Sequence, residues 1–342
     1  MLQGLLGLLK SGSGLSFCSS RQLKNRYGPT TVPEDPAGSK PQRRAQGNGQ
    51  AMTHPNPDFL PVVTACRKRD IPILKRLVDL AVPLLGASEL HIITHRANLA
   101  ALGKLPAFVQ CHDQDTIIPS MTLDSLRSRT DLAEMPLAAG WYFQQFLKLS
   151  LQEHFPHWRR FLIWDSDTLP LRRIDCFDPE GRMIFTKADE WHAPYFRSFE
   201  HLLGIVPTCR QSFIAQHVPV DVDVLVELKS RINARFPGKN YWTWKIMENI
   251  PPQGRNRFSE YETIAHYSLA VHPERCLVRQ IPWMRHGTKL VGRRPEGADL
   301  EFLSGKYAFA AFESSESPLR RLAQPVYARL PEAFRRLIRR GN

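Results

Sequence analysis

The chain of 342 residues lacks several patterns that would place a protein in a class at once. No apolar stretch approaches the roughly 18 residues that suggest a membrane-spanning helix. The short leucine-rich run at 5–9 has no basic segment before it, so we expect neither an anchor nor a secretory signal there. The six cysteines include no CxxC pair, which argues against a disulfide framework or a cysteine-rich zinc site. No internal repeat is visible, and these absences favour a reducing, cytoplasmic setting.

Acidic residues are also in short supply, because the formal net charge is +13. The excess lies at the two ends of the chain. Residues 1–50 carry a net charge of +5 and residues 318–342 carry +6, which leaves +2 for everything between them. The nearly neutral body contains no nucleic-acid-binding motif. We therefore predict that nucleic acid is not a partner.

The pattern of apolar residues predicts one folded domain with an extension at each end. Residues 1–57 are rich in Gly, Ser, Pro, Gln and Arg and are expected to form a disordered basic segment. Beyond them, strand-like runs alternate with helical periodicity. The expected strands are 60–66, 90–94, 107–110, 161–164 and 183–186, and the expected helices are 71–85 and 140–155. This alternation predicts an α/β domain at 58–300, with a mainly parallel sheet flanked by helices.

The extension at 301–342 contains a basic amphipathic segment, LPEAFRRLIRR at 330–340. Pro331 suits the first position of a helix. Phe334, Leu337 and Ile338 would then share one face, with arginines largely on the other. Such a helix can lie on an anionic membrane surface. Docking against the protein's own body is the alternative, and the sequence does not separate the two.

Two carboxylates, Asp165 and Asp167, follow the strand predicted at 161–164. Ligands gather at the carboxyl ends of such strands. A charge at the end of a buried strand is costly unless a metal ion, an arginine or water meets it. Two other DxD strings have simpler explanations, since 221–223 precedes a helix that its acids would cap and 113–115 leads into a polar turn. Asp165 and Asp167 are therefore the predicted ligand-binding pair.

Haloacid-dehalogenase-type phosphatases place a nucleophilic aspartate in a similar string, hhhDxDxT. There the threonine comes two residues after the second aspartate, whereas Thr168 follows Asp167 immediately. That motif also usually opens its domain, and here about 100 residues expected to be ordered come first. Phosphatase chemistry is thus a minor alternative.

Three segments occur in a characteristic order: GWYFQQFLKL at 140–149, WDSDTLPL at 164–171 and FSEYET at 258–263. Together they resemble bacterial GT-A-fold glycosyltransferases, and more narrowly a poorly characterised family of capsule and surface-polysaccharide transferases. The likeness spans roughly 58–295. It implies a GT-A-like, Rossmann-like single catalytic domain with a nucleotide-sugar donor and a glycan or lipid-linked acceptor. The implied setting is cytoplasmic, or peripheral on the inner face of the membrane. A catalytically silent surface-binding protein on the same fold is the alternative.

The resemblance also implies a cofactor and site residues. Mn²⁺ or Mg²⁺ bound by carboxylates would neutralise charge on a diphosphate leaving group. The implied metal ligands are Asp165, Asp167 and His286. The implied donor-binding residues are Thr64, Arg67, Asp70, Lys148, Arg285 and Lys289. The implied acceptor-binding residues are Trp191, His192 and His217. Simpler readings are a solvated turn after the first strand, an exposed helical lysine, a surface histidine in a basic loop and a core tryptophan.

The string Ser259-Glu260-Tyr261-Glu262 has the S-x-x-E form of a capping box. Ser259 is expected to cap a helix, with Glu262 folding back onto the backbone N–H of Ser259. Glu260 would then be free to act as the general base for an acceptor hydroxyl. The alternative is that Glu260 only complements the helix N-terminus.

Overall fold

The computed structural model describes residues 59–129, 136–252 and 256–313, all of which belong to one structural unit, residues 53–342. The segment 1–57, expected to be disordered, and the helix expected at 330–340 lie outside the described residues. No helix within the described ranges is long and apolar enough to cross a bilayer.

A five-stranded sheet lies at the centre, in the order β3-β2-β1-β4-β7. Strands β3, β2, β1 and β4 are parallel to one another, and β7 runs antiparallel to β4. The bounds are β1 (Pro61–Ala65), β2 (Glu89–Thr94), β3 (Val109–Asp113), β4 (Arg160–Trp164) and β7 (His217–Asp221). The three inner strands are apolar on both faces, as expected where helices cover a parallel sheet on both sides. The predicted mainly parallel α/β sheet is confirmed.

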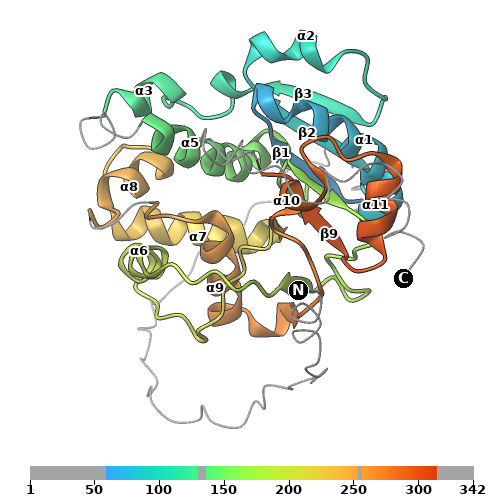
Figure 1. The fold of residues 1–342 in the computed structure, drawn as a ribbon. Coiled ribbons are helices and arrows are strands. Elements are labelled where there is room, and N and C mark those ends of the chain that lie inside the picture. The colour runs from blue at the N-terminus through green and yellow to red at the C-terminus, as the bar shows by residue number, and fades with distance from the viewer. Residues whose placement is uncertain (1–58, 130–135, 253–255, 314–342) are drawn as a thin grey trace, which may run out of the picture. The chain divides into compact units, whose positions relative to one another are not determined.

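Alternate residues of the inner strands enter two separate hydrophobic cores. Val62, Ile92 and Leu162 pack in one core with α1, whereas Val63 and Ile163 pack in the other with α5 to α9. Helices therefore cover both faces of the sheet (Figure 1). The bounds of these helices are α1 (Ile71–Leu85), α5 (Pro136–Ser150), α6 (Ala193–Leu203), α7 (Val222–Arg235), α8 (Trp242–Asn249) and α9 (Glu260–Val271).

Two small strand pairs connect the sheet to the C-terminal part of the domain. Strand β5 (Thr168–Pro170) pairs antiparallel with β9 (Phe309–Ala311), and β6 (Met183–Thr186) pairs parallel with β8 (Cys276–Arg279). The folded body thus extends past residue 300, where the sequence places its end. The other α-helices within the described ranges are α2 (Leu99–Leu102), α3 (Leu123–Arg127), α10 (Gly287–Val291) and α11 (Gly297–Ser304).

Two histidines lie side by side on β2 and β3. His91 Nδ1 is 3.0 Å from His112 Nε2, and His91 Nε2 is 3.0 Å from Glu89 Oε2. Burial lowers the pKa of His91 despite Glu89, with a smaller contribution from His157. Burial, followed by repulsion from His91 and His154, lowers the pKa of His112 to about 4. Both rings therefore resist protonation while the protein is folded.

The contribution of His91 and His112 to the free energy of unfolding is expected to fall as the pH drops from about 6.5 toward 4. In this window the unfolded chain binds protons at these imidazoles and the folded chain does not, so protonation favours unfolding. Urea unfolding of His112→Gln should depend less steeply on pH in this window than that of the wild type. The control is His201→Gln at an exposed histidine. Equal pH dependence in His112→Gln and the wild type would contradict this explanation.

Candidate active site

A cavity of about 730 Å³ opens at the carboxyl ends of β1 and β4. Its floor includes residues 67–70 after β1 and residues 165–167 after β4, and its walls include parts of α5 and the start of α9. A mainly parallel sheet places the residues that follow its strands at one edge. The topology therefore brings together segments that are about 95 residues apart in the chain.

The turn that carries the two aspartates is fixed by backbone hydrogen bonds. Thr168 N donates to Asp165 O at 3.0 Å, and Asp165 N donates to Gln216 O at 2.9 Å. Phe312 N donates to Asp167 O at 2.7 Å, which ties the turn to the chain just after β9. Asp165 and Asp167 consequently project from a closed turn into the cavity.

The cavity holds an excess of carboxylates near Asp167. Burial, followed by repulsion from the carboxylates of Asp165, Asp70 and Glu313, raises the pKa of Asp167 to about 8 against the opposing effect of Arg67. All five of these residues line the cavity. A bound cation would relieve the repulsion among the four acids.

Lys148 lies buried in α5 between two acids. Its Nζ is 2.9 Å from Asp165 Oδ1, 2.5 Å from Glu260 Oε1 and 3.4 Å from the hydroxyl of Tyr261. Burial alone would lower the pKa of Lys148, but Asp165 and Glu260 raise it above its ordinary value. The simpler reading of Lys148 as an exposed helical lysine is wrong, and its ammonium is already engaged by carboxylates of the protein.

The helix predicted after Ser259 is present as α9, and Ser259 Oγ accepts a hydrogen bond from Glu262 N at 3.4 Å. The other expected hydrogen bond of the capping box, from Ser259 N to the Glu262 carboxylate, is wrong. The Glu262 carboxylate instead accepts hydrogen bonds from Ser212 Oγ at 2.6 Å and from Phe213 N at 3.1 Å. Glu262 is buried and faces the loop before β7, so these donors from a distant segment replace the N–H of its own cap.

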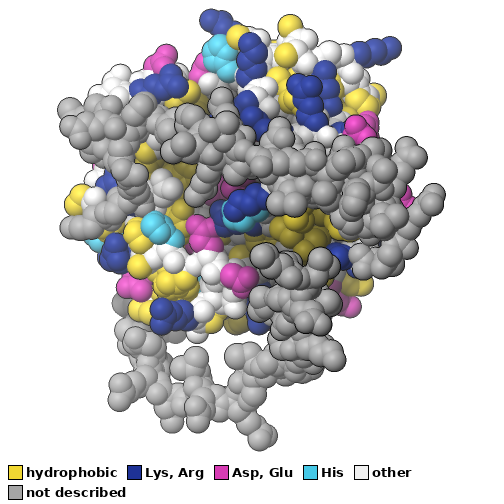
Figure 2. Space-filling view, viewed as in Figure 1, with side chains coloured by type: hydrophobic (Ala, Val, Ile, Leu, Met, Phe, Trp, Pro, Cys, Tyr) yellow, Lys and Arg dark blue, Asp and Glu magenta, His cyan; other side chains and the backbone are white. Residues whose placement is uncertain are grey.

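Cationic side chains line the cavity beside these acids. Arg67, Lys68 and Arg69 follow β1, and Arg127 comes from the end of α3. Arg285 also lines the cavity and pairs with Glu190 and, at 3.3 Å, with Glu313. The RKRD string at 67–70 was a visible signal for Lys68 and Arg69, but only Arg67 and Asp70 were predicted from it. Figure 2 shows acidic and basic side chains adjoining at the centre of one face.

Three other predicted residues lie outside the cavity lining. Thr64 is fully buried within β1, so a direct donor contact there is not compatible with this structure. His286 flanks the N-terminus of α10 with an exposed side chain, and Lys289 is exposed within α10. Arg285 is therefore the one residue of the predicted RHGTK group that lines the cavity.

The predicted acceptor-binding residues also line no described cavity. Trp191 is 38% exposed and stacks on Phe196, and His192 precedes α6. His217 is a core residue, stacked on Trp164. Burial lowers the pKa of His217 to about 3, with Arg279 adding to the effect. The expected acceptor contact of His217 is therefore wrong, because its ring is enclosed by the core.

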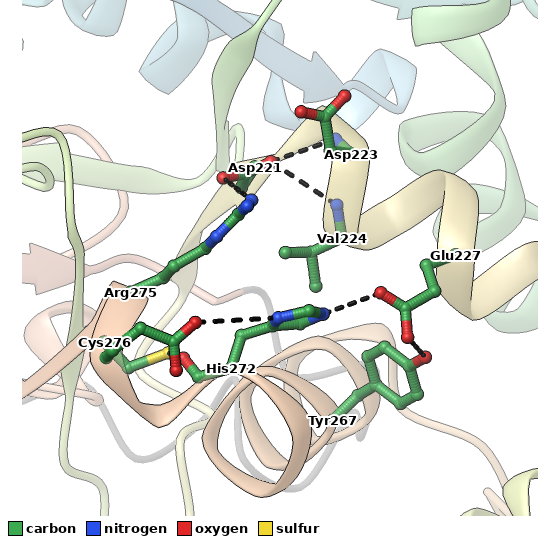
Figure 3. Close-up of polar contacts among 9 residues, drawn as sticks. Asp221, Asp223, Val224, Glu227, Tyr267, His272, Arg275 and Cys276 are labelled. Carbon is green, nitrogen blue, oxygen red and sulfur yellow. Dashed lines mark hydrogen bonds and ion pairs between the residues drawn. The ribbon is translucent and has the colours of Figure 1, made fainter. Parts of the chain in front are cut away.

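The other two DxD strings have the structural roles predicted for them. Asp221 Oδ1 accepts hydrogen bonds from Asp223 N at 2.9 Å and Val224 N at 3.4 Å at the start of α7 (Figure 3). Asp221 Oδ2 also pairs with Arg275 at 3.1 Å. In the string at 113–115, Asp113 Oδ1 accepts a hydrogen bond from Asp115 N at 3.3 Å in an exposed turn. The helix-cap and turn interpretations are confirmed.

A divalent cation fits Asp165 and Asp167 on chemical grounds. Within the described ranges, no three His, Cys, Asp or Glu side chains form a ready-made metal cluster. Mg²⁺, however, commonly takes only one or two carboxylates and completes its shell with water and substrate phosphates. The excess of carboxylates around Asp167 suits such a shared site.

No protein-family model and no curated protein matches this sequence. Among solved structures, the chain is similar to the galactosyltransferase LgtC in complex with donor and acceptor sugar analogs. The TM-score is 0.42 at 13% identity, over 81% of this chain and 99% of that one. It is also similar to the apo form of mouse xyloside xylosyltransferase 1. There the TM-score is 0.38 at 17% identity, over 74% of this chain and 97% of that one.

Proposed function

We propose that the protein is a metal-dependent glycosyltransferase that moves a sugar from a nucleotide-sugar donor to a glycan or lipid-linked acceptor. The observation that carries the proposal is the meeting of Asp165 and Asp167 with a cluster of cationic side chains in one cavity. A nucleoside diphosphate matches both features, because its oxygens can complete a cation's shell and its charge suits the basic residues. The volume of about 730 Å³ lies within the roughly 300–1,000 Å³ of ligand pockets.

In this proposal the chain's own residues hold the donor. Asp167 and Asp165 would bind Mn²⁺ or Mg²⁺, which when bound neutralises charge on the departing diphosphate. Arg67, Lys68 and Arg69 would bind the anionic part of the donor at the end of β1. The buried Lys148 orients the Asp165 carboxylate, since its ammonium donates a hydrogen bond to Asp165 Oδ1.

Glu260 is the proposed general base for the acceptor hydroxyl. It lines the cavity at the first position of α9 and is only 3% exposed. Burial raises the pKa of Glu260, and the Lys148 ammonium opposes that effect. The ammonium therefore favours the ionised carboxylate, which is the form that accepts a proton.

The wider setting of this proposal is the synthesis of cell-surface polysaccharide in the cytoplasm. Association with the inner face of the membrane would come from the amphipathic segment at 330–340, which lies outside the described residues. That part rests on the sequence alone.

The test is turnover of a panel of uridine and guanosine diphosphate sugars by the full chain, with Mn²⁺ or with a chelator. Release of nucleoside diphosphate is expected only with the metal. Glu260→Gln should lower turnover about 100-fold or more, because a glutamine cannot accept the proton. Glu274→Gln, at an exposed glutamate, is the matched control.

Each outcome separates the proposal from its alternatives. Metal-dependent nucleotide binding without turnover of any donor would favour the catalytically silent binding protein. The absence of both nucleotide binding and turnover would contradict the proposed function. Wild-type turnover in Glu260→Gln would overturn the base assignment alone.

A further inference from the structure

A second, smaller cavity of about 330 Å³ lies where two parallel strands end. Strands β6 and β8 pair in parallel, and the residues that follow each of them form its lining, 187–190 after β6 and 280–283 after β8, together with Arg285. Backbone hydrogen bonds hold the first wall, since Lys187 N donates to Arg279 O at 2.9 Å and Ala188 N donates to Ser212 O at 2.8 Å. The cavity is thus built on ordered strand ends, where ligands commonly bind.

The lining combines one aromatic ring with balanced charge. Trp283 is half-buried, and its indole is held by stacking on Phe309 at a centroid distance of 5.2 Å and an interplanar angle of 15°. Two cationic and two anionic side chains also line the cavity, together with the amide of Gln280; the charged residues are Lys187, Arg285, Asp189 and Glu190. A fixed aromatic ring beside hydrogen-bonding groups of no net charge suits a neutral, hydroxyl-rich ring that also has apolar C–H groups. A sugar has this chemistry, whereas a phosphate or a purely apolar ligand does not.

Glu190 and Arg285 join the two cavities. Both residues line the main cavity as well as the second one, and they pair with each other. A molecule that occupies both cavities must therefore extend past this ion pair. The arrangement favours a chain of linked units over a single compact ligand.

We infer that the second cavity binds a neutral sugar ring of the acceptor, beside Trp283, while the acceptor's reacting sugar lies in the main cavity. This inference rests on the proposed function and narrows the acceptor to a glycan of at least two sugar residues. The residues that select it are Trp283, Gln280 and Lys187, none of which was predicted from the sequence.

The probe is an array of immobilised neutral di- and trisaccharides of glucose, galactose and N-acetylglucosamine, printed beside the corresponding monosaccharides. The full chain, loaded with Mn²⁺ and uridine or guanosine diphosphate, is expected to bind at least one oligosaccharide about tenfold more strongly than its monosaccharides. Trp283→Ala should lose that preference, and Trp283→Phe should keep part of it. Gln280→Arg places a longer, charged side chain in the lining from an exposed position, and it should act like Trp283→Ala even if the latter folds poorly. Trp244→Ala, at another half-buried tryptophan that lines neither cavity, is the control.

The same variants also report on the main cavity. Affinity for the nucleoside diphosphates with Mn²⁺ should stay unchanged in Trp283→Phe and Gln280→Arg, because neither residue lines that cavity. No preference for oligosaccharides in the wild type, or an unchanged preference in Gln280→Arg, would overturn the sugar subsite. If the wild type binds glycans but does not bind the nucleoside diphosphates, that result would instead count against the proposed function.

Discussion

Asp167→Ala is expected to abolish Mn²⁺-dependent binding of uridine and guanosine diphosphate while the protein remains folded. The substitution removes the carboxylate that would contact the cation directly, and the affinity should fall about 100-fold or more, beyond the 10- to 100-fold typical of a residue that only orients a ligand. Isothermal titration with Mn²⁺ saturating measures the loss. Asp223→Ala, in the DxD string that begins α7, is the matched control and should bind as the wild type does.

A second measurement on Asp167→Ala needs no nucleotide. The folded-state pKa of about 8 lies above the ordinary value of 3.8, so the folded protein binds a proton that the unfolded chain has released between these pH values. Ionisation of Asp167 therefore destabilises the metal-free protein as the pH rises through that window. Metal-free Asp167→Ala should melt at a higher temperature than the wild type near pH 8. A lower melting temperature together with unchanged nucleotide affinity would overturn the cation site.

Lys148→Met is expected to be the most destabilising single change among the residues of the cavity. It would leave the carboxylates of Asp165 and Glu260 without the buried ammonium that contacts both. Removing one partner of a buried ion pair typically costs about 3–5 kcal/mol, because the remaining charge stays desolvated. Urea unfolding of Lys148→Met beside Lys104→Met, at an exposed lysine, measures the difference.

The double variant Lys148→Met/Glu260→Gln tests the cause of that loss. Neutralising Glu260 removes one of the two stranded charges, so part of the lost free energy of unfolding should return. A double variant no more stable than Lys148→Met would show that the unpaired charge of Glu260 is not the main cause of the loss. Unfolding of Lys148→Met at the wild-type urea concentration would contradict the buried ion-pair network itself.

The regular elements with strong periodicity could be predicted from the sequence. The helix at 71–85 and the strand at 183–186 have the predicted bounds, and β4 differs by one residue. Strand β7 was missed because Pro219 lies within it, and proline counts against a strand in a single sequence. The structure accommodates Pro219 since β7 pairs with β4 alone and is an edge strand of the sheet. The position of β7 beside β4 therefore depends on tertiary packing and could not be predicted from the local sequence.

The candidate site was predictable where its signal was local. Asp165 and Asp167 could be selected because an apolar strand precedes them and a proline-containing segment that predicts a tight turn follows. The partners of Lys148 could not, since Glu260 lies more than 100 residues away and only the packing of α9 on α5 brings them together. For the same reason the sequence predicted that Glu262 would accept a hydrogen bond from the cap of its own helix. In the structure its carboxylate instead accepts hydrogen bonds from the loop at Ser212.

The closed turn after β4 also bears on the entropy of binding. Besides the backbone bonds of Asp165, Asp167 and Thr168, the buried indole of Trp164 donates to Thr168 O at 2.8 Å. The chain has therefore given up its conformational freedom here during folding, before any ligand arrives. Binding need not order this segment again, so more of the interaction energy is expressed as affinity. The amides of Asp165 and Thr168 should accordingly exchange with deuterium slowly in the ligand-free protein, at rates that a bound nucleotide changes little.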